Sequence, residues 1–334
     1  MKKKTYFHYG YKLLIYIMTI WVIATFNFFL IRFMPGDPVE YLVGEEDYLY
    51  LSNAHPEVIE ELKEEYGLDG NILEQYGKYL NKLLHGDLGQ SYQTKVPVLD
   101  IVLKRLARTF RLIFPAVILA GILGVLLGAV AGWKEGTWID KAISRVSLVL
   151  YSIPGYCLGM LGLLLFCFKL GWVPTGGMTS GGLSGGAYVK DILWHMALPV
   201  GVLTISKLSY NVQMMRSTIL SVKKEDFTLV AKTKGISEKR ILFRHVFPNA
   251  ALPMITIITM QMGFIVSGSM MMEQLFNWDG MGLLIYKAIG AKDYPVLQGS
   301  LLILTICIVF SNILSDLLCA LIDPRIKDGI YHEE

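Results

Sequence analysis

The titratable and nucleophilic side chains of this sequence do not form a known catalytic motif. The Gly-Lys pair of a phosphate-binding loop occurs at Gly77 and Lys78, but Tyr79 follows where Ser or Thr would be required. No H-E-x-x-H or G-x-S-x-G stretch is present, and the six histidines lack metal-ligand spacing. The four cysteines all lie in apolar stretches without a C-x-x-C pair, which indicates packed thiols. We therefore expect no catalytic residue, no metal site and no ATPase site in this chain.

The stretch 223–249, KKEDFTLVAKTKGISEKRILFRHVFPN, is the most informative polar segment. Phe227, Val230 and Ala231 recur at i, i+3 and i+4, which predicts a short helix with an apolar face. Gly235 can take the left-handed conformation that ends such a helix. Ser237 could then cap a second helix, which Pro248 would stop. The stretch is either a basic loop that satisfies membrane charge asymmetry or a docking element for a cytosolic partner.

Polar side chains inside apolar segments form a second group of candidates. Burying them against lipid would be costly, so they should face a protein interior or a path through the membrane. Hydrogen bonds between helices are the alternative explanation for each of them. The candidates are Asn211, Gln213, Gln261, Asn312 and Asp316. Pro154 with Gly155, and Pro199, could kink helices and allow a gating motion.

The composition of the chain indicates a membrane protein. Of the 334 residues, 53% are hydrophobic and only 18% are charged, whereas a soluble domain carries roughly a quarter charged residues. A helix needs about 20 apolar residues to cross the bilayer, and irregular backbone cannot stand unpaired in lipid. We therefore predict an all-α integral membrane protein with about six transmembrane helices. The predicted spans are 13–33, 112–133, 146–168, 196–215, 250–272 and 296–315.

Basic residues predict the orientation, because short loops rich in Lys and Arg stay on the cytoplasmic side. The connections 134–145 and 216–249 hold three and eight basic residues, whereas 169–195 and 273–295 hold two each. Both termini are therefore expected in the cytoplasm. Four basic residues within 104–111 oppose this orientation, but they end a long loop, where the rule weakens. The net charge of +3 is too small to suggest a nucleic-acid partner.

These spans divide the chain into four parts. Residues 1–34 comprise the N-terminus and the first transmembrane helix, and 35–108 form an extracytoplasmic loop or cap. Residues 109–322 form a five-helix core that includes 223–249, and 323–334 form a cytoplasmic tail. Within the cap, Pro56 and the acidic run after it predict a short amphipathic helix ending near Gly67. Pro35, Gly36, Asp37 and Pro38 either end the first helix at the membrane surface or contact a binding protein.

The 223–249 stretch resembles the coupling loop of ABC importer permeases, in the dipeptide, oligopeptide and nickel branch. It departs from the general Glu-Ala-Ala core, because Leu229, Val230 and Ala231 stand there. The resemblance covers nearly the whole chain, and an early long loop after one span is similar to the B-type subunit. The other matching segments are FMPGDPVEYLVG (33–44), HGDLGQSY (85–92), LGWVPTGG (170–177), FNWDGMGLL (276–284), DYPVLQG (293–299) and DPRI (323–326).

The resemblance implies a function and a set of partners. The chain would form half of a pore for peptides or related small solutes in a prokaryotic cell membrane, as a heterodimer with a C-type permease subunit. Two ATP-binding subunits would hold ATP and Mg and drive alternating access, and an extracytoplasmic solute-binding protein would deliver cargo. Membrane lipid would surround the pair, and no nucleic acid would bind. The coupling residues implied are Glu225, Asp226, Phe227, Ala231, Lys234, Gly235, Ser237, Arg244 and Asn249.

The outer loop between the last two spans contains a further candidate region. Trp278, Asp279 and Gly280 either belong to an outer gate or include a tryptophan that anchors at the lipid headgroups. Two other classes of function compete with the importer. An ion-coupled secondary transporter would normally place paired charges mid-span, and an intramembrane enzyme would need convergent catalytic groups at one depth. Neither pattern is present in the sequence.

Overall fold

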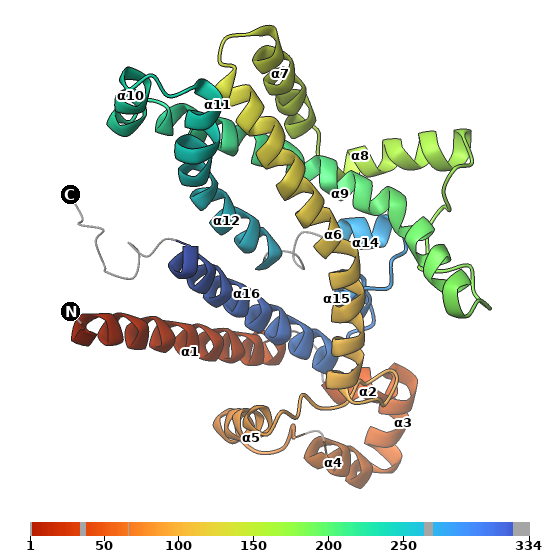
Figure 1. The fold of residues 1–334 in the computed structure, drawn as a ribbon. Helices are drawn as coiled ribbons and strands as arrows, with labels where there is room; N and C mark the ends of the chain where they lie inside the picture. Colours follow the sequence, from red (N-terminus) through yellow and green to blue (C-terminus); the bar gives the residue numbers. More distant parts are fainter. Residues whose placement is uncertain (1, 34–37, 66, 264–269, 323–334) are drawn as a thin grey trace. The chain divides into compact units, whose positions relative to one another are not determined.

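The computed structural model describes residues 2–33, 38–65, 67–263 and 270–322, and these ranges are predominantly helical. The predicted all-α class is confirmed. Contacts divide the chain into two compact units (Figure 1). Unit 1 comprises Met1–Phe7, Thr109–Asp279 and Ile308–Glu334, and unit 2 comprises His8–Arg108 and Gly280–Cys307. Three predicted features lie outside the described residues: the turn with Pro35, Gly36 and Asp37, residues 264–269 of the fifth span, and the tail with DPRI.

Single helices that could cross a membrane overlap five of the six predicted positions, and a bent pair of helices lies at the third. In the described residues, five helical segments are long and apolar enough: Gly10–Leu30, Val98–Trp133, Gly185–Val222, Glu238–Met262 and Tyr294–Leu318. A bent pair of helices forms the sixth if it is counted as one span. The prediction of about six transmembrane helices is therefore confirmed. The helix of the second span, α6 (Val98–Trp133), begins well before the predicted start of that span at residue 112.

The third predicted span, 146–168, is wrong as a single helix. Helix α7 (Trp138–Ser152) ends before Pro154, and the chain then turns by 93° into α8 (Gly155–Gly162) and the π-helix η1 (Leu163–Lys169). Proline disfavours helical backbone at the preceding residue, and Ile153 is extended with φ −92° and ψ 121°. By contrast, Pro199 lies within α9 (Gly185–Val222), which continues through it.

In unit 1, glycines allow α6 to pack closely against α9. A Cβ atom added to Gly128 would lie 2.6 Å from the carbonyl oxygen of Val212, and one added to Gly132 would lie 2.8 Å from Ile219 Cβ. Such small residues let transmembrane helices approach one another. Besides α7, α8, η1 and the end of the last helix, the described part of this unit contains five elements that follow α9 in the chain. They are α10 (Asp226–Thr233), α11 (Glu238–Ile241), the π-helix η2 (Leu242–Val246), α12 (Phe247–Gly263) and α14 (Met270–Leu275).

Unit 2 contains most of α1 (Lys2–Arg32), the short helices after it, and α15 (Met281–Gly290) with the start of α16 (Tyr294–Ile322). The short helices are α2 (Pro38–Val43), α3 (Glu45–Ala54), α4 (Pro56–Glu65) and α5 (Ile72–Leu84). Figure 1 shows them gathered near the C-terminal end of α1. Helix α4 confirms the helix predicted after Pro56, and Gly67 follows it with φ +67°.

A buried aspartate ties the segment before α6 to the turn between α15 and α16. Asp293 accepts hydrogen bonds from the Ser91 hydroxyl at 2.5 Å and the Tyr92 amide at 3.0 Å. Tyr294 packs edge-on against Tyr41, with ring centroids 5.6 Å apart. Two of the segments that carried the family resemblance, HGDLGQSY and DYPVLQG, therefore meet in the folded unit.

Candidate functional site

The inner side of the α10–α11 segment is built into the core of unit 1. Ala231 and Ile241 are buried against residues from α6, α9 and α12. Figure 1 shows α10 and α11 at the same end of unit 1 as the last turn of α6. The buried residues of this cluster are Ala129, Met215, Ile219, Ala231, Ile241, Val246, Ala250 and Met254. Three long helices therefore contact the segment through a single apolar cluster.

The outer side of the same segment exposes large apolar side chains. Phe227 is 42% exposed, Val230 51% and Phe243 67%. Phe227, Val230 and Ala231 stand at the predicted spacing in α10, but only Ala231 is buried, together with Thr228, whereas Phe227 and Val230 are exposed. We call the exposed apolar residues Phe227, Leu229, Val230 and Phe243 the docking surface.

Polar and charged residues border the docking surface. Gly235 has φ +71°, so the left-handed turn predicted between the two helices is confirmed. Ser237 occupies the N-cap position of α11, but its side chain makes no capping hydrogen bond. The exposed polar and charged candidates are Glu225, Asp226, Lys234, Ser237 and Arg244. Glu225 and Asp226 also line an open hollow beside the last turns of α9.

The prediction that Pro248 stops the second helix is wrong. The chain stays helical from α11 through η2 into α12, and Pro248 lies in the first turn of α12. The π-helix directly before Pro248 alters the backbone pairing that proline would otherwise break, so the helix continues. Asn249 is therefore an exposed residue of a helix, and its Nδ2 donates to the His245 carbonyl at 2.6 Å.

Two of the membrane-path candidates meet inside unit 1. Gln261 Nε2 on α12 donates a hydrogen bond of 2.9 Å to Asn211 Oδ1 on α9. Asn211 is fully buried. Asn211 Nδ2 and Gln261 Oε1 are also buried, and within the described residues neither has a hydrogen-bond partner. One donor and one acceptor are thus left without a protein partner at the contact between two predicted spans.

The other path candidates are distributed differently. Gln213 Nε2 donates to the Ser144 carbonyl of α7 at 3.2 Å, so this amide joins two helices. Asn312 and Asp316 lie one turn apart on α16, and both are half-buried. Within the described ranges, no group of three or more His, Cys, Asp or Glu residues could hold a metal ion.

The outer-loop candidates lie between α14 and α15. Trp278 is fully buried, whereas a tryptophan that anchors at headgroups lies at the membrane surface. Gly280 is the N-cap of α15, and Asp279 is half-buried. Glu273, which was not among the predicted residues, is fully buried on α14 and accepts a hydrogen bond of 2.6 Å from the Thr109 hydroxyl. Glu273 directly follows the predicted span 250–272. An acidic residue at the end of an apolar segment is the sequence feature that could have identified it.

Residues 124–328 match the family described as binding-protein-dependent transport system inner membrane component, and residues 11–113 match the N-terminal family of the same membrane components. The chain belongs to this family. It is therefore a membrane-spanning permease subunit of an ABC importer.

Named relatives and a solved structure agree with this assignment. The dipeptide transport system permease protein DppB of Alkalihalophilus pseudofirmus is 33% identical over 331 residues, covering 94% of this chain and 97% of the relative. The di/tripeptide transport system permease protein DppB of Pseudomonas aeruginosa is 33% identical over 328 residues, covering 93% and 96%. An inward-facing structure of the MetNI methionine ABC transporter has a TM-score of 0.54 at 15% identity, covering 67% of this chain and 97% of that chain. At that identity the likeness concerns the fold.

Proposed function

We propose that this chain forms half of the translocation pore for peptides or related small solutes, and that the docking surface binds an ATP-binding subunit. The exposed apolar side chains of α10 and η2 carry the proposal. Phe227, Leu229 and Val230 lie on a segment rich in Lys and Arg outside the candidate spans, where lipid would not cover them, and Phe243 lies near the start of the candidate span Glu238–Met262. The other side of this segment packs against α6, α9 and α12. Movement of a bound subunit would therefore be transmitted to three membrane helices at once.

The proposed assembly contains the partners that the resemblance implied. A C-type permease subunit completes the pore, two ATP-binding subunits hold ATP and Mg, and an extracytoplasmic solute-binding protein delivers the cargo. The chain itself has no ATPase site. Its termini and the docking surface face the cytoplasm of a prokaryotic cell, as the distribution of basic residues supports. The peptide cargo is supported by the two DppB relatives, which are named as dipeptide and di/tripeptide transport permeases.

The amide pair of Asn211 and Gln261 is our candidate for a contact with cargo inside the membrane. Buried polar groups normally find a partner, so an unpaired donor and acceptor mark a place where a peptide or water could bind. A peptide backbone offers a carbonyl to Asn211 Nδ2 and an amide to Gln261 Oε1. Trp278, Asp279 and Gly280 remain the proposed outer gate.

The docking proposal is tested by placing a charge in the docking surface. Val230→Asp should abolish copurification of the ATP-binding subunits and peptide uptake, while the variant still inserts into the membrane. Because Val230 is exposed, the substitution leaves the core of unit 1 unchanged.

Leu183→Asp is the matched control, since Leu183 is 42% exposed and lies in the glycine-rich connection before α9, outside the docking surface. It should retain both copurification and uptake. Normal assembly and uptake in Val230→Asp would contradict the docking role, as would an equal loss in both variants.

A further inference from the structure

A cavity of about 250 Å³ lies in unit 2 between the end of α1, helix α5 and the start of α16. Its polar lining includes Arg32, Lys78, Tyr79, Lys82, Asp87 and Gln298. The importer mechanism proposed above uses none of these residues.

The helices around the cavity place it at the membrane surface. Arg32 follows the apolar span Gly10–Leu30 by two residues, which is about 3 Å along a helix. Tyr294, at the other wall, is the first residue of the span Tyr294–Leu318. The headgroup layers add roughly 10–15 Å in total to a hydrocarbon core of about 30 Å. Both walls of the cavity therefore reach the level of the lipid headgroups.

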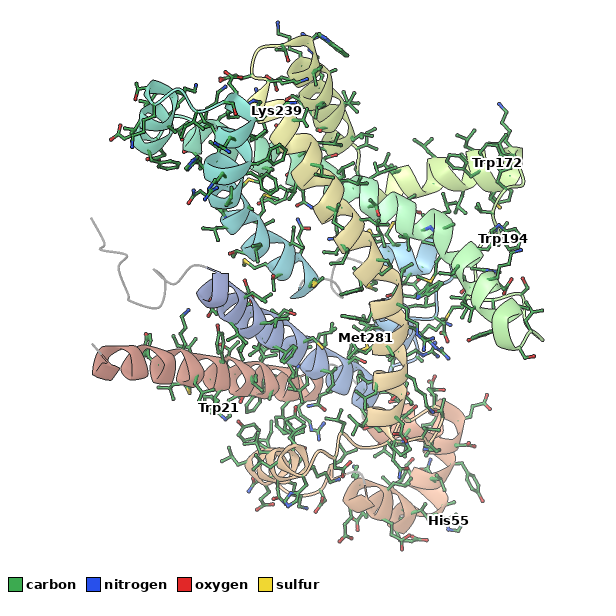
Figure 2. All side chains as sticks on the ribbon, in the orientation of Figure 1. Trp21, His55, Trp172, Trp194, Lys239 and Met281 are labelled. Carbon is green, nitrogen blue, oxygen red and sulfur yellow. The ribbon has the colours of Figure 1, made fainter. Side chains whose placement is uncertain are left out.

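Helix α5 is held at the same level by contacts with α1. The Tyr76 and Thr25 hydroxyls lie 2.7 Å apart, and the rings of Tyr76 and Tyr79 each pack 5.3 Å from Phe28. Thr25 and Phe28 belong to the apolar span, so α5 lies against its last turns. Figure 2 labels Trp21, which is 47% exposed one turn before Thr25. With Leu14 and Met18 on the same helix face, Trp21 offers an apolar surface to an acyl chain.

Three basic side chains, Arg32, Lys78 and Lys82, and one carboxylate, Asp87, line the cavity, and this balance favours an anion. Arg32 Nε donates to Gln75 Oε1 at 2.7 Å, which orients the guanidinium, and the half-buried side chain leaves its charge partly desolvated. Within the described ranges, no carboxylate pairs with Arg32 or Lys82, whereas Lys78 is paired with Asp69 at 2.7 Å. An anion bound here would offset the desolvation of Arg32.

Two further donors belong to residues in the wall of the cavity. Tyr79 Oη and Gln298 Nε2 are buried, and in the part of the chain that the structure describes neither makes a hydrogen bond of normal geometry. Tyrosine hydroxyl and glutamine amide groups both donate readily to phosphate oxygens. The cavity is smaller than the roughly 300–1,000 Å³ typical of pockets for drug-sized ligands, so it suits a single anionic group.

We propose that this cavity binds the phosphate of a membrane phospholipid headgroup, held by Arg32 and Lys82, with an acyl chain along the exposed face of α1. The site would fasten α5 and the start of α16 to the membrane surface. It depends on neither the cargo nor the docking surface of the importer.

The experiment is native mass spectrometry of the assembled, detergent-purified importer titrated with dioctanoyl phosphatidylglycerol. The wild type should bind this lipid, and Arg32→Gln and Lys82→Ala should each weaken binding by about tenfold or more, since each removes a charge-assisted contact to phosphate. Lys82 is exposed, so its variant reports on binding even if Arg32→Gln impairs folding. Lys104→Ala, an exposed lysine of the same unit outside the cavity, should bind like the wild type.

Two further probes distinguish the source of the phosphate. Dioctanoylglycerol, which lacks phosphate, and inorganic phosphate, which lacks acyl chains, should both bind much more weakly than dioctanoyl phosphatidylglycerol. Equal binding of dioctanoylglycerol would overturn the proposal, because recognition would not involve phosphate. Tight binding of inorganic phosphate without binding of the lipid would overturn the lipid assignment, and unchanged affinity in Lys82→Ala would overturn the role of that residue.

Discussion

Arg216 donates two hydrogen bonds to Asp140, from Nε to Oδ1 at 2.6 Å and from Nη2 to Oδ2 at 2.9 Å. The same carboxylate accepts the Gly136 amide at 2.9 Å and the Ser144 hydroxyl at 3.1 Å. The bidentate pair joins α7 to the last two turns of α9, directly before the segment that carries the docking surface. The Asp140–Arg216 pair therefore holds the C-terminal end of α9, from which the chain continues into α10.

Asp140→Asn should destabilise the protein by about 1–3 kcal/mol, because a nearly buried carboxylate loses its charge while Arg216 keeps its own. Thermal unfolding in detergent measures the effect. The matched control is Glu135→Gln, since Glu135 lies 3.6 Å from Lys223 and is 48% exposed. Such surface pairs contribute about 0–1 kcal/mol. Equal shifts of the unfolding temperature in both variants would show that Asp140 has no special role.

Gly128→Ala should destabilise unit 1 by about 1–3 kcal/mol, because the added methyl group would lie 2.6 Å from the Val212 carbonyl oxygen and force α6 away from α9. Gly201→Ala is a suitable comparison, since a Cβ at that position of α9 meets nothing within 4 Å. Alanine stabilises a helix interior relative to glycine, so this variant should be neutral or slightly more stable. Thermal unfolding in detergent compares the two variants. An unfolding temperature of Gly128→Ala equal to that of the wild type would contradict the close packing of α6 against α9.

The fold class and the approximate spans could be predicted from the sequence, because lipid demands long apolar helices and the chain contains them. The bend at Pro154 could be predicted as a kink, but not as a 93° turn that divides the span. At Pro248 the same reasoning was wrong, because the π-helix before it allows the helix to continue. Proline restricts the local backbone, whereas tertiary packing determines whether the helix ends.

For the candidate site, the left-handed turn at Gly235 could be predicted, because few other residues adopt φ near +71°. The division between Ala231 and Phe227 could not be predicted, since helical spacing places both on one apolar face. Which part of that face is buried depends on α6, α9 and α12, which pack against Ala231 but not against Phe227. The contact between Gln261 and Asn211 is likewise a tertiary contact that no local pattern reveals.

Gln261→Leu should lower peptide uptake by roughly two- to tenfold, the range expected when one hydrogen bond to cargo is lost. Copurification of the ATP-binding subunits should be unchanged, because the residue lies away from the docking surface. Gln213→Leu provides the comparison, since its amide donates to the Ser144 carbonyl and should affect stability more than uptake. Normal uptake with a reduced unfolding temperature in Gln261→Leu would indicate that the amide pair only joins α9 to α12.

Tyr79 predicts a dependence of stability on alkaline pH. Burial raises the pKa of Tyr79 from 10.0 to about 12, because the ionised phenolate is poorly solvated in the fold. The folded state therefore retains a proton that the unfolded state loses above about pH 10, so this contribution to stability is complete below pH 10 and is lost as the pH rises toward 12. Tyr79→Phe should show a smaller fall in unfolding temperature over that interval. Identical pH profiles for the two proteins would contradict the burial of the hydroxyl.

The docking of α10 onto an ATP-binding subunit is tested most directly by cross-linking in native membranes. A photoreactive benzoylphenylalanine at Phe227, which is 42% exposed on the docking surface, is compared with the same group at Leu183. The docking proposal predicts a covalent product between position 227 and an ATP-binding subunit, and none with that subunit from position 183. Cross-links from position 227 only to lipid or to an extracytoplasmic protein would contradict it.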